Sequence, residues 1–260
     1  MPQIQIGIQL ASLRLPFRKA IQTAARLGAT AVEIDARREL KPNELSDTGL
    51  RQLRKMLEDL NLRVSAVTFR TRRGYNIEEE LDRRIEATLQ AMKLAYRLGC
   101  NVVVNQVGLI PNEVPSPGWD LLLESLSEIG KYSQREGAFL AARTGAEDPA
   151  DLLRLIDALP DGSIGVDYDP GLLLINGFSA REAVEILGPH ILHVHARDGV
   201  RDLAQRRGLE VPIGRGSADF PELLGVLEEH RYRGWFTVER ESPQDPITEV
   251  AHAVQYLRNI

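Results

Sequence analysis

The chain has 260 residues, a length typical of one α/β barrel, and 27% of them are charged. Its formal net charge of −5 disfavours nucleic-acid binding, because no basic face or Lys/Arg-rich tail is visible. No apolar run approaches the roughly 18 residues that a membrane span needs, and the first ten residues do not resemble a signal peptide. The single cysteine, Cys100, excludes an internal disulfide, so we expect a cytoplasmic protein.

Apolar, β-branched segments alternate with segments of helical periodicity along the whole chain. This alternation predicts parallel strands that are joined by right-handed helical crossovers. Gly28, Gly99 and Gly137 each follow a helical segment, as C-cap glycines do. The predicted strands, in chain order, are residues 4–10, 31–36, 63–69, 101–108, 138–144, 163–169, 191–196 and 235–240.

Eight strand–helix units over this length average about 32 residues each, which favours a closed barrel. An open doubly wound sheet would show a glycine fingerprint after its first strand, and the segment GIQLASLRL does not match GxGxxG. No linker or low-complexity segment divides the chain. The sequence therefore predicts an α/β fold with one domain, residues 1–260, built as a (β/α)8 TIM barrel.

Polar side chains stand at the carboxyl ends of the predicted strands, where such a barrel places its active site. Asp169, His195 and Glu239 end three adjacent strands, and one imidazole with two carboxylates suits manganese, magnesium or zinc. A hydrogen-bonded polar cluster without a metal is the alternative. Alternate residues of a strand share a face, which gives the other inward-facing residues: Gly7, Gln9, Glu33, Asp35, Thr68, Arg70, Val104, Gln106, Ala141, Arg143, Asp167, His193 and Thr237.

Three further segments carry hypotheses of their own. His193 is interpreted as a core histidine with its own partners, or as a residue that supports a metal ligand. Residues 212–217, with two glycines before a helix, predict either an anion-binding loop or a tight turn. The charged segment 196–216 is predicted to be a loop long enough to cover the barrel mouth.

The last hundred residues carry the most specific pattern. The segment VDYDPGLLLINGFSAREAVEILGPHILHVHARDGVR is followed by VPIGRGSADFPELLGVLEEHRYRGWFTVERE. These segments resemble the sixth-strand aspartate, the HVHxxD strand, the GxGxxDF loop and the glutamate of the closing strand in the xylose isomerase-like barrel superfamily. Within it, the chain looks similar to the sugar phosphate isomerase/epimerase group, with its tagatose-type 3-epimerases and hydroxypyruvate isomerases. The resemblance covers essentially the whole chain.

The resemblance implies one divalent metal ion, which family members hold with a glutamate, an aspartate, a histidine and a second glutamate. The last three correspond to Asp169, His195 and Glu239. Arg201 corresponds to an arginine that contacts substrate in the epimerases.

The first glutamate of that set corresponds to Arg143 in this chain. A permanent positive charge at that position opposes binding of a divalent cation. Arg143 is expected either to point away, or to fork across Asp169 and Glu239 in place of the cation. Glu147, four residues later, is an alternative source of a carboxylate.

The resemblance implies an isomerase or epimerase that acts on a small sugar or sugar phosphate by proton transfer at the barrel mouth. In this hypothesis Glu239 is the general base, and His195 and Arg143 complete the catalytic set. A non-catalytic barrel that binds a sugar or sugar acid, and has lost its metal and its acid–base pair, is the alternative. Family barrels often form dimers or tetramers, so a homo-oligomer is left open. The residues expected to bind substrate are Arg201, Gln106, Asp35, Arg70 and Glu147.

Overall fold

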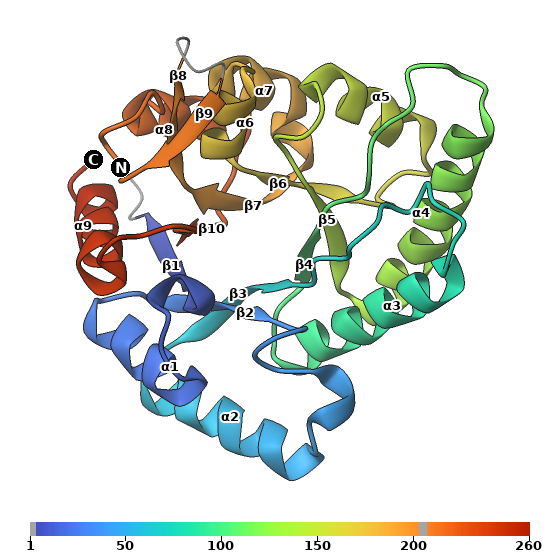
Figure 1. Cartoon of the computed structure of the whole chain (residues 1–260). Coiled ribbons are helices and arrows are strands. Elements are labelled where there is room, and N and C mark those ends of the chain that lie inside the picture. Colours follow the sequence, from blue (N-terminus) through green and yellow to red (C-terminus); the bar gives the residue numbers. More distant parts are fainter. Residues whose placement is uncertain (1–3, 203–206) are drawn as a thin grey trace.

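A computed structural model describes residues 4–202 and 207–260. Eight parallel strands close into a barrel in the order β1-β10-β7-β6-β5-β4-β3-β2, and helices surround it (Figure 1). The prediction of a (β/α)8 barrel is therefore confirmed. The barrel strands are β1 (Gln5–Gln9), β2 (Ala31–Asp35), β3 (Arg63–Thr68), β4 (Val102–Asn105), β5 (Phe139–Arg143), β6 (Gly165–Tyr168), β7 (Ile191–Ala196) and β10 (Trp235–Val238).

The strands form where β-branched and apolar residues run together, because parallel strands are buried on both faces. All four residues of β4 are buried, for example. Gly7 of β1 shows how tightly the interior is filled, since a Cβ at this position would lie 2.7 Å from Oγ1 of Thr237. The main core lies between the outer faces of the strands and the surrounding helices.

Most of the helices begin at a residue whose side chain accepts a backbone hydrogen bond, the exceptions being α1 and α3. Ser46 accepts from the amide of Gly49, and Asp245 accepts from the amide of Thr248. Among the described residues, no helix is both long and apolar enough to cross a bilayer. The helices are α1 (Phe17–Arg26), α2 (Asp47–Asp59), α3 (Leu81–Arg97), α4 (Pro117–Glu136), α5 (Pro149–Ala158), α6 (Pro170–Asn176), α7 (Ala180–Leu187), α8 (Phe220–Glu229) and α9 (Pro246–Arg258), with 3-10 turns η1 (Leu10–Leu13), η2 (Pro42–Glu44) and η3 (Gly188–His190).

The segment after β7 differs from the predicted loop. It contains two strands, β8 (Asp198–Asp202) and β9 (Arg207–Val211), which pair antiparallel outside the barrel. The pair packs closely on α6, because a Cβ at Gly208 would lie 2.2 Å from the carbonyl oxygen of Ile175. This segment is therefore anchored beside the barrel mouth by α6.

Several strands end earlier than predicted, since the residues that follow them serve turns and helix caps. β6 ends at Tyr168, and the side chain of Asp169 caps α6 by accepting a hydrogen bond from the amide of Leu172. β10 ends at Val238, so Glu239 also lies just beyond its strand. These shifts place both carboxylates at the carboxyl end of the barrel, where the neighbouring strands bring their own polar groups.

Candidate active site

Arg143 bridges two carboxylates at the carboxyl end of the barrel. Its Nη2 lies 2.5 Å from Oδ2 of Asp169 and 2.5 Å from Oε2 of Glu239, and its Nε donates to the same Asp169 oxygen over 3.2 Å. All three side chains are buried. Of the two arrangements expected for Arg143, the structure therefore has the one in which the guanidinium forks across both carboxylates.

The charges in this cluster stabilise one another. Burial by itself would lower the pKa of Arg143, but the carboxylates of Glu239 and Asp169 raise that pKa well above its ordinary value. Burial would likewise raise the pKa of Glu239, but the positive charges of Arg143 and His195 hold it well below its ordinary value. Glu239 is therefore ionised, and its negative charge is fully compensated by cations.

A second buried arginine stands beside this bridge. The Nη1 of Arg197 lies 3.6 Å from Oδ2 of Asp169 and 4.0 Å from Oε1 of Glu239. Its other nitrogens donate to Glu210 and Glu241, each over 2.8 Å. The hairpin β8–β9 thus contributes to the site, since Glu210 on β9 helps to hold Arg197.

Asp167 organises the two histidines of β7. Its carboxylate lies 2.8 Å from Nδ1 of His193 and 2.8 Å from Nδ1 of His195. This contact leaves Nε2 of His195 facing two carboxylates, 2.7 Å from Oε2 of Glu33 and 3.3 Å from Oε2 of Glu239. Burial alone would lower the pKa of His195, but Asp167 and Glu33 raise it to about 10, so the ring is an imidazolium at neutral pH.

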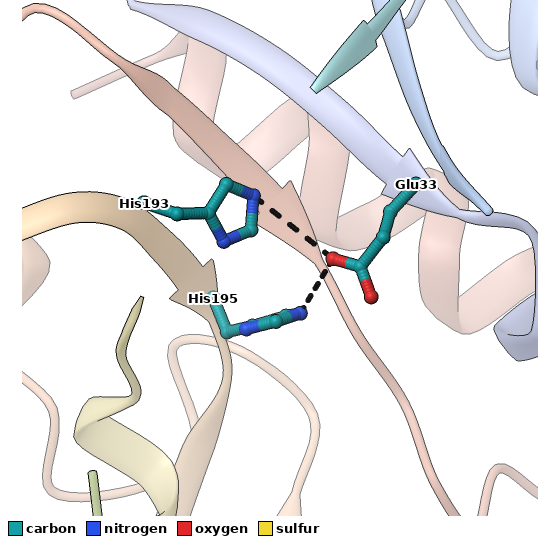
Figure 2. A group of neighbouring side chains, drawn as sticks. All are labelled: Glu33, His193 and His195. Atoms are coloured by element: carbon teal, nitrogen blue, oxygen red, sulfur yellow. Dashed lines mark ion pairs between the residues drawn. The ribbon is translucent and has the colours of Figure 1, made fainter. Parts of the chain in front are cut away.

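Glu33, His193 and His195 form a group that offers three potential metal ligands, with their ligand atoms within 4.8 Å of one another. Figure 2 shows both imidazoles pointing at the same Glu33 oxygen. That oxygen and Nε2 of His195 lie 2.7 Å apart and pair as carboxylate and imidazolium, so a metal ion here would have to displace the proton of His195. His193 also has partners for both ring nitrogens, Asp167 and Thr237.

Glu33 and Asp167 were predicted to face the barrel interior, but neither was chosen as a catalytic, binding or metal-ligating residue. Each lies two residues before a chosen residue, Asp35 or Asp169, and therefore shares its face of the strand. Two neighbours fix Glu33 through its Oε1, which accepts from Nε2 of Gln9 over 2.9 Å and from the hydroxyl of Thr68.

The ligand set predicted from the resemblance, Asp169, His195 and Glu239, does not fit a divalent metal in this chain. One Asp169 oxygen caps α6 and the other pairs with Arg143. The Arg143 guanidinium lies between the two carboxylates that would have to converge on the ion, and its charge cannot be removed by deprotonation. Arg143 thus stands between Asp169 and Glu239, and metal binding by Asp169, His195 and Glu239 stays a prediction.

A pocket of about 670 Å³ opens above the cluster at the barrel mouth. Glu239 lines it, as do two residues predicted to bind substrate, Asp35 and Arg70. Arg70 is 42% exposed along its side chain, and its Nη2 lies 2.7 Å from Oε1 of Glu239. The lining consists of Gln9, Ala11, Arg14, Asp35, Arg37, Arg38, Thr68, Arg70, Thr71, Arg72, Glu239, Arg240 and Glu241.

Three other residues predicted to bind substrate lie outside this lining. Gln106 follows β4 and is exposed, without a described contact to the cluster. Glu147 lies half-buried after β5, where burial raises its pKa to about 7. Arg201 is exposed on β8, with its guanidinium against Gly177 at the end of α6. The structure therefore does not bring Gln106, Glu147 or Arg201 to the pocket, because their strands or loops lead their side chains elsewhere.

The glycine loop at 212–217 already has an internal anion. The carboxylate of Asp198 accepts from the amides of Gly214 and Gly216 over 3.0 and 2.8 Å, and also from the amides of Gly199 and Ala218. Of the two interpretations of this loop, the tight turn is the one that the structure supports. The backbone amides that could have bound a phosphate donate their hydrogen bonds to Asp198 instead.

Comparison with known proteins agrees with this architecture. The family described as "Xylose isomerase-like TIM barrel" matches residues 21–260. An inosose dehydratase of Bacillus thuringiensis is 25% identical over 224 residues, which cover 75% of this chain and 74% of that protein. The family and this relative support the expectation of a sugar isomerase- or epimerase-type enzyme.

Solved structures share the fold over almost the whole chain. A xylose isomerase domain protein from Planctomyces limnophilus superposes with a TM-score of 0.86 at 21% identity, covering 99% of this chain and 97% of that one. A xylose isomerase-like barrel from Mycobacterium smegmatis in complex with magnesium gives a TM-score of 0.79 at 18% identity, with 99% and 96% covered. From the family match over most of its length, this chain belongs to the xylose isomerase-like TIM barrel family.

Proposed function

We propose that this chain is a sugar isomerase- or epimerase-type enzyme, which removes and returns a proton beside the carbonyl group of a polyhydroxy ketone or aldehyde. The observation that carries the proposal is the position of Glu239, whose carboxylate lines the mouth pocket while Arg70 and Arg143 hold its two oxygens. Epimerisation beside a carbonyl and loss of water from an inosose can both begin with removal of such a proton.

Glu239 is the general base in this proposal. It is ionised at neutral pH and lines the pocket, so the proton of a bound sugar carbon can pass to its Oε1. The electron pair of the broken C–H bond moves to the carbonyl oxygen and gives an enediolate. Arg70 lies beside Oε1 of Glu239 and extends into the pocket. Its guanidinium is therefore the group placed to stabilise the negatively charged enediolate oxygen of the substrate.

Arg143 stands in this proposal where relatives of the epimerase group hold their metal ion. It is only 4% exposed and does not line the pocket, so it acts by positioning Glu239 and Asp169. His195 supports Glu239 in the same way, from 3.3 Å. The group Glu33, His193 and His195 is the one place among the described residues where a metal ion would find potential ligands without displacing Arg143.

A binding barrel without catalysis is the second candidate, and one observation favours it. Arg143, His195 and Arg70 together hold the pKa of Glu239 well below its ordinary value, which makes the carboxylate a weak base while these contacts last. The proton-transfer proposal thus requires that substrate draws Arg70 away from Glu239.

Deuterium exchange separates the two candidates. The protein is incubated in D2O with a panel of ketoses, inososes and their phosphates, and carbon-bound deuterium beside the carbonyl is followed by NMR. Exchange that depends on the protein supports the enzyme. Saturable binding of a sugar, with no exchange above that of the buffer, supports the binding barrel.

A further inference from the structure

Positive charge gathers at the mouth pocket of an otherwise acidic chain. Six arginines line the pocket with three carboxylates, although the whole chain carries a net charge of −5. A concave surface with an excess of positive charge attracts negatively charged ligands, so the pocket favours an anionic ligand. The lining arginines are Arg14, Arg37, Arg38, Arg70, Arg72 and Arg240.

Two of these arginines already have carboxylate partners. Arg240 pairs with Glu249 and Glu210, and Arg70 pairs with Glu239. Within residues 4–202 and 207–260, the other four make no ion pair. Two of them only donate to a backbone carbonyl oxygen: Arg14 to that of Glu241 and Arg37 to that of Arg70.

Three of these four arginines, Arg37, Arg38 and Arg72, lie in the loops after β2 and β3 and line the same pocket. The Nη1 of Arg37 donates over 2.6 Å to the carbonyl oxygen of Arg70, which ties the loop after β2 to the loop after β3. Arg37 and Arg72 also line an adjoining pocket of about 520 Å³, so both stand at the junction of the two hollows. Arg38 lies beside Arg37 in the first pocket.

The glycine loop at 212–217 offers no comparable place for an anion. The amides of Gly214 and Gly216 in this loop already donate hydrogen bonds to the buried carboxylate of Asp198. A second anion would meet the negative charge of Asp198 and find these donors used. Apart from Arg14, which follows η1, the arginines of the β2 and β3 loops are therefore the lining arginines without an ion pair among the described residues.

We propose that Arg37 and Arg72, with Arg38 beside them, form an anion subsite for a terminal phosphate or carboxylate of the substrate. The guanidinium groups supply the planar donors that both anions accept, while the sugar chain extends from this rim toward Glu239. The substrate class is thus an anionic polyhydroxy ketone or aldehyde. This inference rests on the proposed function for the reacting end of the ligand, and on the arginines alone for the anionic end.

The test measures binding, independently of turnover, with three probes of similar size. D-fructose, D-fructose 6-phosphate and D-gluconate are titrated into the full chain by calorimetry at low and at high salt. The expected result is that one of the two anions binds at least about tenfold more tightly than fructose, and that salt weakens it. Which of them binds more tightly distinguishes phosphate from carboxylate as the recognised group.

A double substitution, Arg37→Gln with Arg72→Gln, assigns the binding to the subsite. It is expected to weaken the preferred anion at least about tenfold and to leave fructose unchanged. The matched control, Arg54→Gln, removes an exposed arginine from α2 and should change neither. Circular dichroism and the unfolding midpoint show that the variants are folded.

Equal affinity for fructose and both anions would overturn the inference, as would an anion affinity that survives the double substitution. Failure of all three probes and of inorganic phosphate to bind at about 10 mM would overturn it too. Anion binding at these arginines without any deuterium exchange would leave the subsite in place and contradict only the proposed catalysis.

Discussion

Arg143 lies 2.5 Å from Glu239, with its guanidinium where the resemblance places a glutamate ligand of a metal ion. The contact joins β5 to the residue that follows β10, across the end of the barrel. The same nitrogen also reaches Asp169, so one positive charge holds two carboxylates that would otherwise repel each other in a buried site. The guanidinium of Arg143 thus offsets the negative charge of these carboxylates, as a bound cation would.

Replacing Arg143 with methionine should strongly destabilise the protein. The variant keeps most of the side-chain volume but leaves Asp169 and Glu239 buried with less compensation, which we expect to cost about 3 kcal/mol or more of unfolding free energy. Urea denaturation of wild type and variant measures the difference. In a background of Asp169→Asn and Glu239→Gln the same replacement should cost clearly less, and an equal cost would contradict the ion-pair account.

Replacing Glu239 with glutamine should remove the base while keeping the shape of the site. We expect protein-dependent deuterium exchange into the sugar to fall by about 100-fold or more. Glu241→Gln is the matched control, because Glu241 lines the same pocket but is exposed and has no role in proton transfer. Exchange that survives in Glu239→Gln and disappears in Glu241→Gln would show that Glu239 is not the base.

Asp198 should be a strong stabilising residue of the loop at 212–217. Its carboxylate accepts from four backbone amides, and alanine would leave buried donors without a partner. We expect Asp198→Ala to lower the unfolding free energy by about 2–4 kcal/mol, since several charge-assisted hydrogen bonds are lost together. Asp198→Asn, which retains an acceptor, should lose less, and a neutral Asp198→Ala would refute this role.

We expect the unfolding free energy to depend on pH partly through the protonation of Glu39. Burial, against the hydrogen bond from the Asp35 amide, raises its pKa from 4.5 to about 7. A raised pKa in the folded state means that the folded chain binds the proton more tightly, so this contribution is present below about pH 4.5 and is lost as the pH rises through about 7.

The measurement for Glu39 is the unfolding free energy of wild type minus that of Glu39→Gln across this range. We expect the difference to fall by on the order of 1 kcal/mol between about pH 5.5 and pH 7.5. Glu39→Gln keeps an acceptor for the Asp35 amide, so the hydrogen bond is conserved. A difference that stays flat, or rises with pH, would show that the Glu39 carboxyl is not buried as described.

The barrel could be predicted from the sequence because its strands are buried apolar runs and most of its helices have a capping side chain, as in VVVN of β4 and Ser46 before α2. The hairpin β8–β9 was predicted as a loop, since its charged residues carry no strand pattern of their own and it is held by packing on α6. Local pattern does not encode such packing.

The sequence predicted where the candidate site lies, at the carboxyl ends of the strands, but not most of the contacts within it. Period two gave the face that holds Glu239 and Asp169, and the resemblance drew attention to Arg143. Asp35 was chosen and does line the pocket, but the role of Glu33 could not be predicted, because it depends on how deep that side chain lies inside the barrel. Asp198 was missed for a similar reason, since its partners follow it by up to twenty residues.

The most direct test of the account is a manganese titration of chelator-treated wild type and Arg143→Glu, followed by calorimetry and elemental analysis. The substitution restores the carboxylate of the family pattern beside Asp169, His195 and Glu239. We expect no binding by wild type up to about 1 mM manganese and about one manganese per chain for Arg143→Glu. One tightly held metal per wild-type chain, lost in Glu33→Gln, would instead place a metal at Glu33, His193 and His195 and contradict the claim that Arg143 is the cation of this site.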